Sequence, residues 1–273
     1  MSESPDEPRL PAGFAPADPA AAPAVPRDAA TVMLVRDTTG PLEVFLLRRV
    51  VGMAFAGGMT VFPGGGVDER DMDASVAWHG PTPRWWAERF RCDPALAMAL
   101  VCAAVRETFE ESGVLLAGPD AGSIVSDTTP YHPARAALVA KEYSFAEFLA
   151  ANGLVLRADL LRPWSNWITP AQEPRRYDTR FFLAALPEGQ LADGATTEAD
   201  AAGWQRPADA IAECRRGERA LMPPTWVTLA DLDRCATVAD AMAVERVIDP
   251  IRPDIVDDGE SLRVVVPTEP ESR

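Results

Sequence analysis

The sequence has little lysine, histidine or cysteine. Lys141 is the single lysine among 26 basic residues, and the chain has only 2 histidines and 4 cysteines. The cysteines form no CxxC pair and have no histidine at ligand spacing, so the sequence indicates neither a zinc site nor a disulfide framework. We therefore expect reduced thiols at all four positions, Cys92, Cys102, Cys214 and Cys235.

Long apolar runs are also missing. No stretch approaches the roughly 18 uninterrupted apolar residues of a membrane-spanning helix, and the opening MSESPDEPRL lacks the basic and apolar regions of a secretory signal. Acidic residues outnumber basic ones by 41 to 26, and the formal net charge of −15 disfavours sequence-independent contact with nucleic acid. We expect a cytoplasmic protein that binds neither nucleic acid nor membrane.

The length of 273 residues and the 47% of hydrophobic residues fit one α/β domain with appended tails. We assign residues 1–28, rich in alanine and proline, to a flexible arm, residues 29–249 to the domain, and residues 250–273 to an acidic tail that includes one apolar run, VVV. Two β-branched runs at 29–37 and 42–50, separated by the turn-rich TTGP, predict a strand hairpin. Strands mixed with few helices indicate a mixed α/β sandwich.

Further segments predict the remaining elements. We expect strands at 113–118, 164–170 and 178–187, helices at 133–152, 207–218 and 225–247, and an irregular insertion at 72–92. Trp164 and Trp167 stand three residues apart in an extended segment. Successive side chains of a strand alternate between its faces, so the two rings are expected on opposite faces, at least one of them in the core.

The clearest local signals define a helix over residues 94–112. Asp93 suits the N-cap, Pro94 the first helical position and Gly113 the stop. Three glutamates at spacings i, i+3 and i+4 share one narrow sector of this helix: Glu107, Glu110 and Glu111. An apolar stripe occupies the other side: Met98, Val101, Cys102, Val105 and Phe109. We expect an exposed acidic face opposite a buried back.

Three neighbouring carboxylates repel one another, so a cation is expected to offset their charge. Mg²⁺ fits, because it is a hard ion that binds carboxylate oxygens together with water and phosphate. The simpler alternative is a solvated acidic face. The glycine run 64–66 upstream favours the metal site, because glycines allow positive φ and close backbone approach and leave a carbonyl free to face a metal or a phosphate.

The segments FPGGG (62–66) and AAVRETFEESGV (103–114) together resemble the Nudix box, G-x5-E-x7-R-E-U-x-E-E-x-G-U, where U is apolar. The resemblance implies the Nudix α/β/α sandwich with a mixed sheet and an insertion at 67–93, near the mouth of the active site. It also implies that Mg²⁺ or Mn²⁺ is bound by Glu107, Glu110, Glu111 and the Gly65 carbonyl, and that Arg106 orients the glutamates.

The sequence departs from the box at one place. Met98 stands where the pattern has its first glutamate, the residue that normally braces the glycine loop and the arginine. Glu69 and Asp93 are the candidates to replace it. The metal-binding glutamates themselves are all present.

Other segments of the chain resemble one branch of the Nudix family. The segments LLRRVVGMAFAGGMTVFPGGGVD, WSNWITP and RRYDTRFFLA are similar to the Nudix branch that includes the peroxisomal coenzyme A diphosphatases of animals and their bacterial relatives. We therefore expect hydrolysis of the diphosphate bond of coenzyme A or an acyl derivative. The alternatives are an NADH or ADP-ribose diphosphatase and a non-catalytic Nudix-fold ligand sensor. Nudix enzymes are often dimers, so a homodimer is expected.

Further charged residues are candidates for the site. Glu198, in a polar loop before Gly203, is a candidate metal ligand or general base, with an ordinary loop acid as the alternative. Arg175, Arg176 and Arg180 are candidates to clamp substrate phosphates, because guanidinium groups bind phosphate in a bidentate manner. Surface ion pairing is the alternative for these three arginines.

Overall fold

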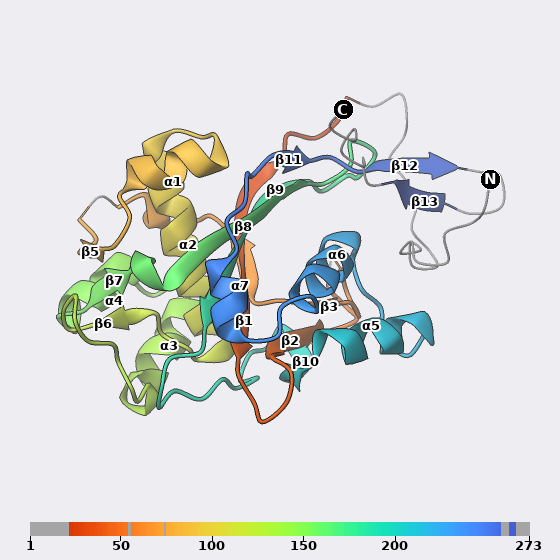
Figure 1. The fold of residues 1–273 in the computed structure, drawn as a ribbon. Helices are drawn as coiled ribbons and strands as arrows, with labels where there is room; N and C mark the ends of the chain where they lie inside the picture. Colours follow the sequence, from red (N-terminus) through yellow and green to blue (C-terminus); the bar gives the residue numbers. More distant parts are fainter. Residues whose placement is uncertain (1–21, 54–55, 74, 258–261, 266–273) are drawn as a thin grey trace.

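The computed structural model describes residues 22–53, 56–73, 75–257 and 262–265. A mixed sheet runs through its centre in the order β10-β2-β1-β9-β8-β11 (Figure 1). Its long strands are β1 (Arg27–Arg36), β2 (Glu43–Arg49), β8 (Leu161–Ile168), β9 (Tyr177–Ala185) and β10 (Ala199–Gln205). β1 lies between β2, which is antiparallel to it, and β9, which is parallel to it. Two short strands add to this sheet: β3 (Thr60–Val61) pairs with β2, and β4 (Gly64–Gly66) pairs with β1.

The central strands are buried on both faces. Along β1, Val32 and Leu34 belong to one core, and Met33 and Val35 to the other, as the two-residue period of a strand requires. One face is covered by α1 (Pro83–Phe90), α2 (Pro94–Ser112), α3 (His132–Val139) and α4 (Phe145–Ala151). The other face is covered by α5 (Pro207–Arg215), α6 (Pro223–Leu232) and α7 (Val238–Ala243). The predicted α/β/α sandwich is confirmed (Figure 1).

The ends of the domain differ from the sequence assignment. The predicted hairpin forms, with Val35 of β1 opposite Val44 of β2, but β1 begins at Arg27, inside the segment assigned to the arm. Residues 1–21 lie outside the described residues. In the assigned tail, β11 (Pro250–Ile251) joins the sheet beside β8, and β12 (Asp254–Asp257) pairs with β13 (Leu262–Val265).

The insertion at 67–93 is more regular than expected. It contains a 3-10 helix, η1 (Glu69–Met72), a short strand, β5 (Trp78–His79), and α1. The helix α1 is held by Thr82, whose side chain accepts a hydrogen bond from the Trp85 amide, and it buries the Trp86 ring 5.5 Å from that of Phe182. The expectation of an irregular segment was wrong, because Thr82 and the following proline start a short amphipathic helix within a Pro-rich stretch.

Two long helix predictions prove to be pairs of helices. The segment 133–152 is interrupted by Lys141, with φ of 59°, and α4 restarts at the N-cap Ser144, which forms a capping box with Glu147. The segment 225–247 is divided in the same way between α6 and α7, where Thr237 is the N-cap. The strand expected at 113–118 shortens to β6 (Ala117–Gly118), which pairs with β7 (Val155–Arg157).

The two tryptophans of β8 share one core rather than opposite faces. Trp164 and Trp167 are 1% and 3% exposed and both pack in the core beside α5 to α7. The pairing of β8 with β9 shifts register between Pro163 and Ser165. A β-bulge adds one residue to a strand, and this changes the face to which the following side chains point. The prediction of opposite faces was wrong for that reason.

Candidate functional site

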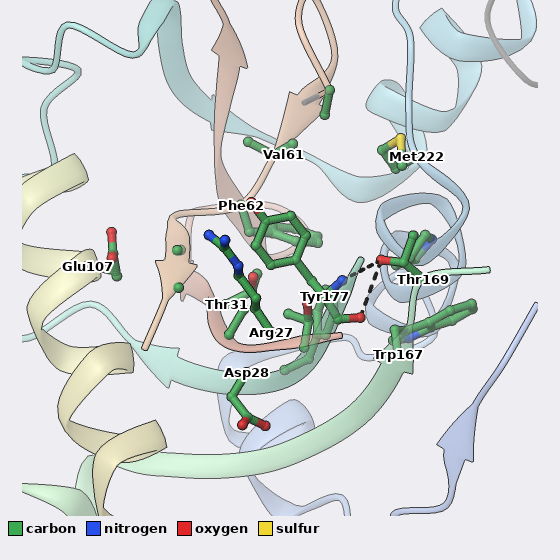
Figure 2. Close-up of a pocket in the computed structure, with 18 of the residues that line it drawn as sticks. Arg27, Asp28, Thr31, Val61, Phe62, Glu107, Trp167, Thr169, Tyr177 and Met222 are labelled. Atoms are coloured by element: carbon green, nitrogen blue, oxygen red, sulfur yellow. Dashed lines mark hydrogen bonds between the residues drawn. The ribbon is translucent and has the colours of Figure 1, made fainter. Parts of the chain in front are cut away.

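A cavity of about 540 Å³ opens between the glycine strand β4, the helix α2 and the ends of β8 and β9. At one end its wall is formed by Glu107, Glu110 and Glu111. Figure 2 shows Glu107 on the α2 side of this cavity, with Trp167 and Met222 on the opposite side. The cavity therefore has a carboxylate end and an apolar end.

The helix α2 has the bounds that the sequence predicts. The Asp93 side chain accepts a 2.9 Å hydrogen bond from the Leu96 amide, and Gly113 ends the helix with φ of 73°. The predicted apolar stripe is buried, with Met98 partly buried against the same core. The acidic face, however, is covered as well, since Glu111 is only 7% exposed. The expectation of an exposed acidic face was wrong because β4 lies across it.

Glycine in β4 permits this close approach. The Gly64 amide donates a 2.8 Å hydrogen bond to Oε2 of Glu111. A Cβ atom at Gly65 would lie 2.6 Å from Cδ of Glu107, so no larger residue fits there without displacing the carboxylate. Neither glycine has positive φ. The strand therefore needs glycine for space next to the carboxylates and not for an unusual backbone conformation.

Arg106 joins the glutamates to the glycine strand. Its Nη1 donates to Glu107 at 2.7 Å and to Glu110 at 3.4 Å, and its Nη2 donates to the Gly66 carbonyl at 3.1 Å. Its remaining contacts go to Asp71 of η1, at 2.8 Å from both Nε and Nη2. Arg106 therefore contacts the glutamates, the glycine strand and η1 at the same time.

Asp71 was missed in the sequence, and the two candidates named for its place were wrong. Glu69 is exposed, and Asp93 caps α2. Asp71 is 3% exposed and makes the bidentate ion pair with Arg106. The sequence did carry a signal for it: counted forward from Gly65, the spacing G-x5-E of the box reaches Asp71, whereas counting back from Arg106 across the insertion reaches Met98.

The glutamates carry charge that the protein only partly neutralises. Burial raises the pKa of Glu107, Glu110 and Glu111, and the proximity of Glu107 adds to the effect on Glu111. Arg106 and the Gly64 amide are the donors that contact these carboxylates. A buried group of carboxylates with this excess of negative charge fits a divalent cation that prefers oxygen ligands.

The three glutamates are not arranged as a set of metal ligands in this structure. Within the described ranges, no three acidic, histidine or cysteine side chains converge closely enough to hold a metal ion. Glu107 and Glu110 are turned to Arg106, and Glu111 is turned to the Gly64 amide. Binding a cation would therefore require these side chains to exchange their present donors for the ion.

Glu198 reaches the same cavity from a distant segment. It lies in the loop before β10, and Nη2 of Arg49 donates to its Oε2 at 3.1 Å. Its side chain is 53% exposed. The structure therefore brings Glu198 and the three glutamates of α2 to one cavity.

The three arginines expected to clamp phosphates are not at the cavity. Arg180 is 5% exposed, and its Nη1 lies 2.6 Å from Asp28 and 3.0 Å from Asp178. Arg176 donates to the backbone carbonyls of Thr169 and Ala24, and Arg175 is exposed. None of the three lines the cavity. The expected cluster fails because Arg180 of β9 is buried and pairs with Asp28 of β1 and with Asp178 of its own strand.

Among the described residues, four other basic side chains line the cavity: Arg27, Arg49, Arg106 and Lys141. Arg49 and Arg106 are paired with glutamates, and Lys141 lies 3.5 Å from Asp68. Arg27 has no ion pair with any carboxylate in the described part of the chain. It lies beside Thr31 and Tyr177 on the cavity wall (Figure 2). Sequence reasoning had placed it in the flexible arm.

The glycine strand, the carboxylate helix and the sandwich together define the Nudix class of protein. The chain belongs to the Nudix hydrolase family, and the family described as the NUDT19 Nudix domain matches residues 88–232. A crystal structure of a Nudix hydrolase from Alicyclobacillus acidocaldarius has 30% sequence identity and a TM-score of 0.68, over 82% of this chain and 98% of that one.

Several curated relatives are animal proteins. The acyl-coenzyme A diphosphatase NUDT19 of Gallus gallus is 30% identical over 266 residues, covering 78% of this chain and 70% of the relative. The Homo sapiens protein of that name is 27% identical, covering 72% and 62%. A Nudix hydrolase of Caenorhabditis elegans is 32% identical, covering 76% and 61%. The chain thus spans about two thirds of the length of these relatives.

All four cysteines are free thiols. No helix in the described ranges is both long and apolar enough to cross a membrane.

Proposed function

We propose that this protein is a Mg²⁺- or Mn²⁺-dependent hydrolase that cleaves the diphosphate bond of coenzyme A or acyl-coenzyme A in the cytoplasm. The observation that carries the proposal is the group of glutamates buried beneath the glycine strand at one end of a cavity whose other end is apolar. The similarity to acyl-coenzyme A diphosphatases of chicken and human supports the choice of substrate. The products would be adenosine 3′,5′-bisphosphate and phosphopantetheine or its acyl derivative.

The residues of the carboxylate end have separate roles in this proposal. Glu107, Glu110, Glu111 and the Gly65 carbonyl hold the metal, which when bound acidifies a water and neutralises developing charge on phosphate. Arg106 keeps the glutamates aligned beside the glycine strand. Glu198 or Glu110 accepts the proton of the attacking water, since both line the cavity.

The apolar end is proposed to bind the parts of the substrate away from the diphosphate. It is lined by aromatic and aliphatic side chains with few charges, as ligand cavities for large organic groups usually are: Phe62, Trp167, Phe181, Met222 and Pro223. Arg27 contacts a phosphate of the substrate, in place of the arginines assigned from the sequence. Its guanidinium needs no release from a carboxylate in order to do so.

A metal-dependent hydrolysis panel tests the proposal. Purified protein is incubated with coenzyme A, acetyl-coenzyme A, NADH, ADP-ribose and nucleoside triphosphates, with Mg²⁺, Mn²⁺ or EDTA, and products are identified by mass spectrometry. We expect adenosine 3′,5′-bisphosphate from the coenzyme A substrates only when metal is present. Faster turnover of NADH or ADP-ribose, or turnover in EDTA, would contradict the proposal.

One observation favours the alternative substrates, NADH and ADP-ribose. Coenzyme A carries on its adenosine ribose a 3′-phosphate that NADH and ADP-ribose lack. Of the arginines expected to read it, Arg180 and Arg176 contact aspartates or a backbone carbonyl, and Arg175 does not line the cavity. Preference for NADH or ADP-ribose in the panel would therefore favour a dinucleotide diphosphatase. A ligand sensor would instead bind one of these compounds without hydrolysing it. Light scattering measures whether the expected homodimer forms.

A further inference from the structure

We propose that Lys141 contacts the diphosphate of the substrate at the opening of the cavity. This inference rests on the proposed function, because it assigns a further residue to the same site. Lys141 is the single lysine among 26 basic residues, and its side chain lines the cavity although it is 72% exposed. The one ammonium group of an arginine-rich chain thus stands at this site.

The carboxylate that pairs with this ammonium does not need it. Nζ of Lys141 lies 3.5 Å from Oδ2 of Asp68. Arg70 already contacts both oxygens of that carboxylate, with Nε and Nη2 at 3.0 Å, and holds the pKa of Asp68 well below its usual range. An exposed ion pair of this kind contributes little to stability. The ammonium can therefore leave Asp68 for another anion at little cost.

The ammonium lies at the carboxylate end of the cavity. Burial raises the pKa of Glu110, and the positive charges of Arg106 and Lys141 oppose that rise. Asp68, the partner of Lys141, comes directly after the glycine strand and its neighbour Val67. A diphosphate bound beside the glutamates would place its oxygens near Lys141, whose ammonium is a compact donor of three hydrogen bonds.

The other cations at this end are committed to the glutamates. Arg106 and Arg49 are 11% and 19% exposed, and they pair with Glu107 and Glu198. Turning either guanidinium to a phosphate would take a donor away from a glutamate of the site. Lys141 can approach a phosphate without that loss.

The backbone of Lys141 adopts a conformation that lysine seldom takes. Its φ of 59° is left-handed and ends α3, where its amide donates to the Leu138 carbonyl at 2.8 Å and its own carbonyl accepts from Arg70 at 3.4 Å. Glycine takes this conformation without cost, whereas a Cβ atom makes it unfavourable. Such strained residues cluster at functional sites. The fold alone favours glycine at position 141, so the side chain points to a role in the cavity.

Three variants of Lys141 separate charge from backbone strain. For Lys141→Gln, kcat/KM for coenzyme A should fall about tenfold, the lower end for a charge-assisted contact, because the ammonium is exposed. Lys141→Arg should recover most of this loss. Lys141→Gly should lose as much activity as Lys141→Gln, with a thermal midpoint equal to or above that of the parent, since glycine relieves the strain. Dephospho-coenzyme A should show the same losses, because it keeps the diphosphate.

Arg84→Gln is the control for net charge. It removes one positive charge from α1, where Arg84 is 83% exposed and does not line the cavity. Its kcat/KM should match that of the parent. A tenfold loss in this variant too would show that charge anywhere on the surface attracts the anionic substrate, and it would overturn the contact.

A labelling experiment detects the contact without turnover. Because Lys141 is the single lysine, an acetylating N-hydroxysuccinimide ester has two amines to modify, this side chain and the N-terminus. The protein is labelled with Mg²⁺ and saturating α,β-methylene-ADP, whose diphosphate analogue has an uncleavable carbon bridge, and each amine is followed by mass spectrometry. We expect slower acetylation of Lys141 and an unchanged rate at the N-terminus. Adenosine, which has no phosphate, should slow neither.

The outcomes distinguish this inference from the proposed function. Parent protein that leaves coenzyme A intact, while α,β-methylene-ADP still protects Lys141, refutes the proposed substrate and supports the diphosphate contact. Parent protein that hydrolyses coenzyme A refutes the contact alone if Lys141→Gln and Lys141→Gly keep parental kcat/KM, or if Lys141 is acetylated at the same rate with and without α,β-methylene-ADP.

Discussion

The two ends of the cavity are built in different ways. The carboxylate end comes mainly from one helix turn and one glycine strand, with Glu107, Glu110 and Glu111 within five consecutive residues. The apolar end is assembled from segments far apart in the chain, among them Phe62, Trp167 and Met222. Local spacing therefore encodes the proposed chemistry, whereas substrate selection depends on how distant segments pack.

The ends also differ in how their charges are satisfied. At the carboxylate end, buried negative charge exceeds the positive charge of Arg106, which leaves room for a cation. Arg180, which does not line the cavity, pairs through Nη1 with Asp28 of β1 and with Asp178 of its own strand, so its pair with Asp28 links β9 to β1. A cluster of like charges in a sequence thus indicates a binding site only when the folded protein leaves those charges without neutralising partners.

The largest effect is expected from Glu111→Gln, which tests the carboxylate end. Glutamine keeps an oxygen that can accept the Gly64 amide hydrogen bond, so the fold should persist, while the loss of a ligand charge lowers turnover on the order of a thousandfold, as for other preorganised groups. Steady-state kinetics under saturating Mg²⁺ measures this. The control is Glu88→Gln, at an exposed position of α1. Turnover equal to that of the parent in Glu111→Gln would contradict the assignment of the metal site.

The next effect tests the substrate end through Arg27→Ala. A charge-assisted hydrogen bond contributes about 1.5–3 kcal/mol, so kcat/KM for coenzyme A should fall roughly ten- to a hundredfold. Arg175→Ala, an exposed arginine away from the cavity, should be close to the parent. Repeating both with dephospho-coenzyme A shows which phosphate is contacted: an equal loss on both substrates assigns Arg27 to the diphosphate, and no loss on either removes it from the site.

A moderate effect on stability is expected from Met98→Glu, the change that restores the family pattern. Met98 packs against the core, so an added carboxylate should lower the free energy of unfolding by about 1–3 kcal/mol. Chemical denaturation measures it, with Met98→Leu as the apolar control. A Met98→Glu variant as stable as the parent and more active would show that a carboxylate on α2 can also pair with Arg106, as Asp71 does.

The smallest effect is the pH dependence of stability in the metal-free protein. Burial raises the pKa of Glu107, Glu110 and Glu111 above the ordinary 4.5. The folded protein therefore retains protons that the unfolded chain loses, and the stability present below pH 4.5 is lost as the pH rises toward 8. In EDTA we expect the thermal midpoint to fall by roughly 2–4 °C between pH 5 and 8. Mg²⁺, or Gln at positions 107 and 111, should flatten this fall; a flat profile in EDTA would contradict it.

Much of α2 could be predicted because its signals are local. Asp93 and Gly113 mark its ends, and the spacing of the glutamates places them on one face. The burial of that face could not be predicted, because it depends on β4 crossing the helix. The same limit applies to Arg180, whose partner Asp28 is 152 residues away. Asp71, by contrast, stands at the G-x5-E spacing from Gly65 and was within reach of the sequence.

The errors in the fold have a similar origin. The bulge that places Trp164 and Trp167 in one core is a property of the pairing between β8 and β9 and leaves no mark on the spacing of the tryptophans. Lys141 interrupts a helical pattern by adopting a left-handed conformation, which a lysine rarely signals. Strand pairing and turn geometry decided these features, and both are set by long-range contacts.

The ion pair between Asp71 and Arg106 has a consequence for how this chain tolerates change in length. It fastens the start of the insertion to α2, and the next fixed point along the chain is β5 (Trp78–His79), which pairs with β7. Doubling the length of a flexible loop costs only about 0.6 kcal/mol in closure entropy. Residues can therefore be added or removed between these two points while the glycine strand and the glutamates keep their distances, which makes this loop the natural place for related chains to diverge.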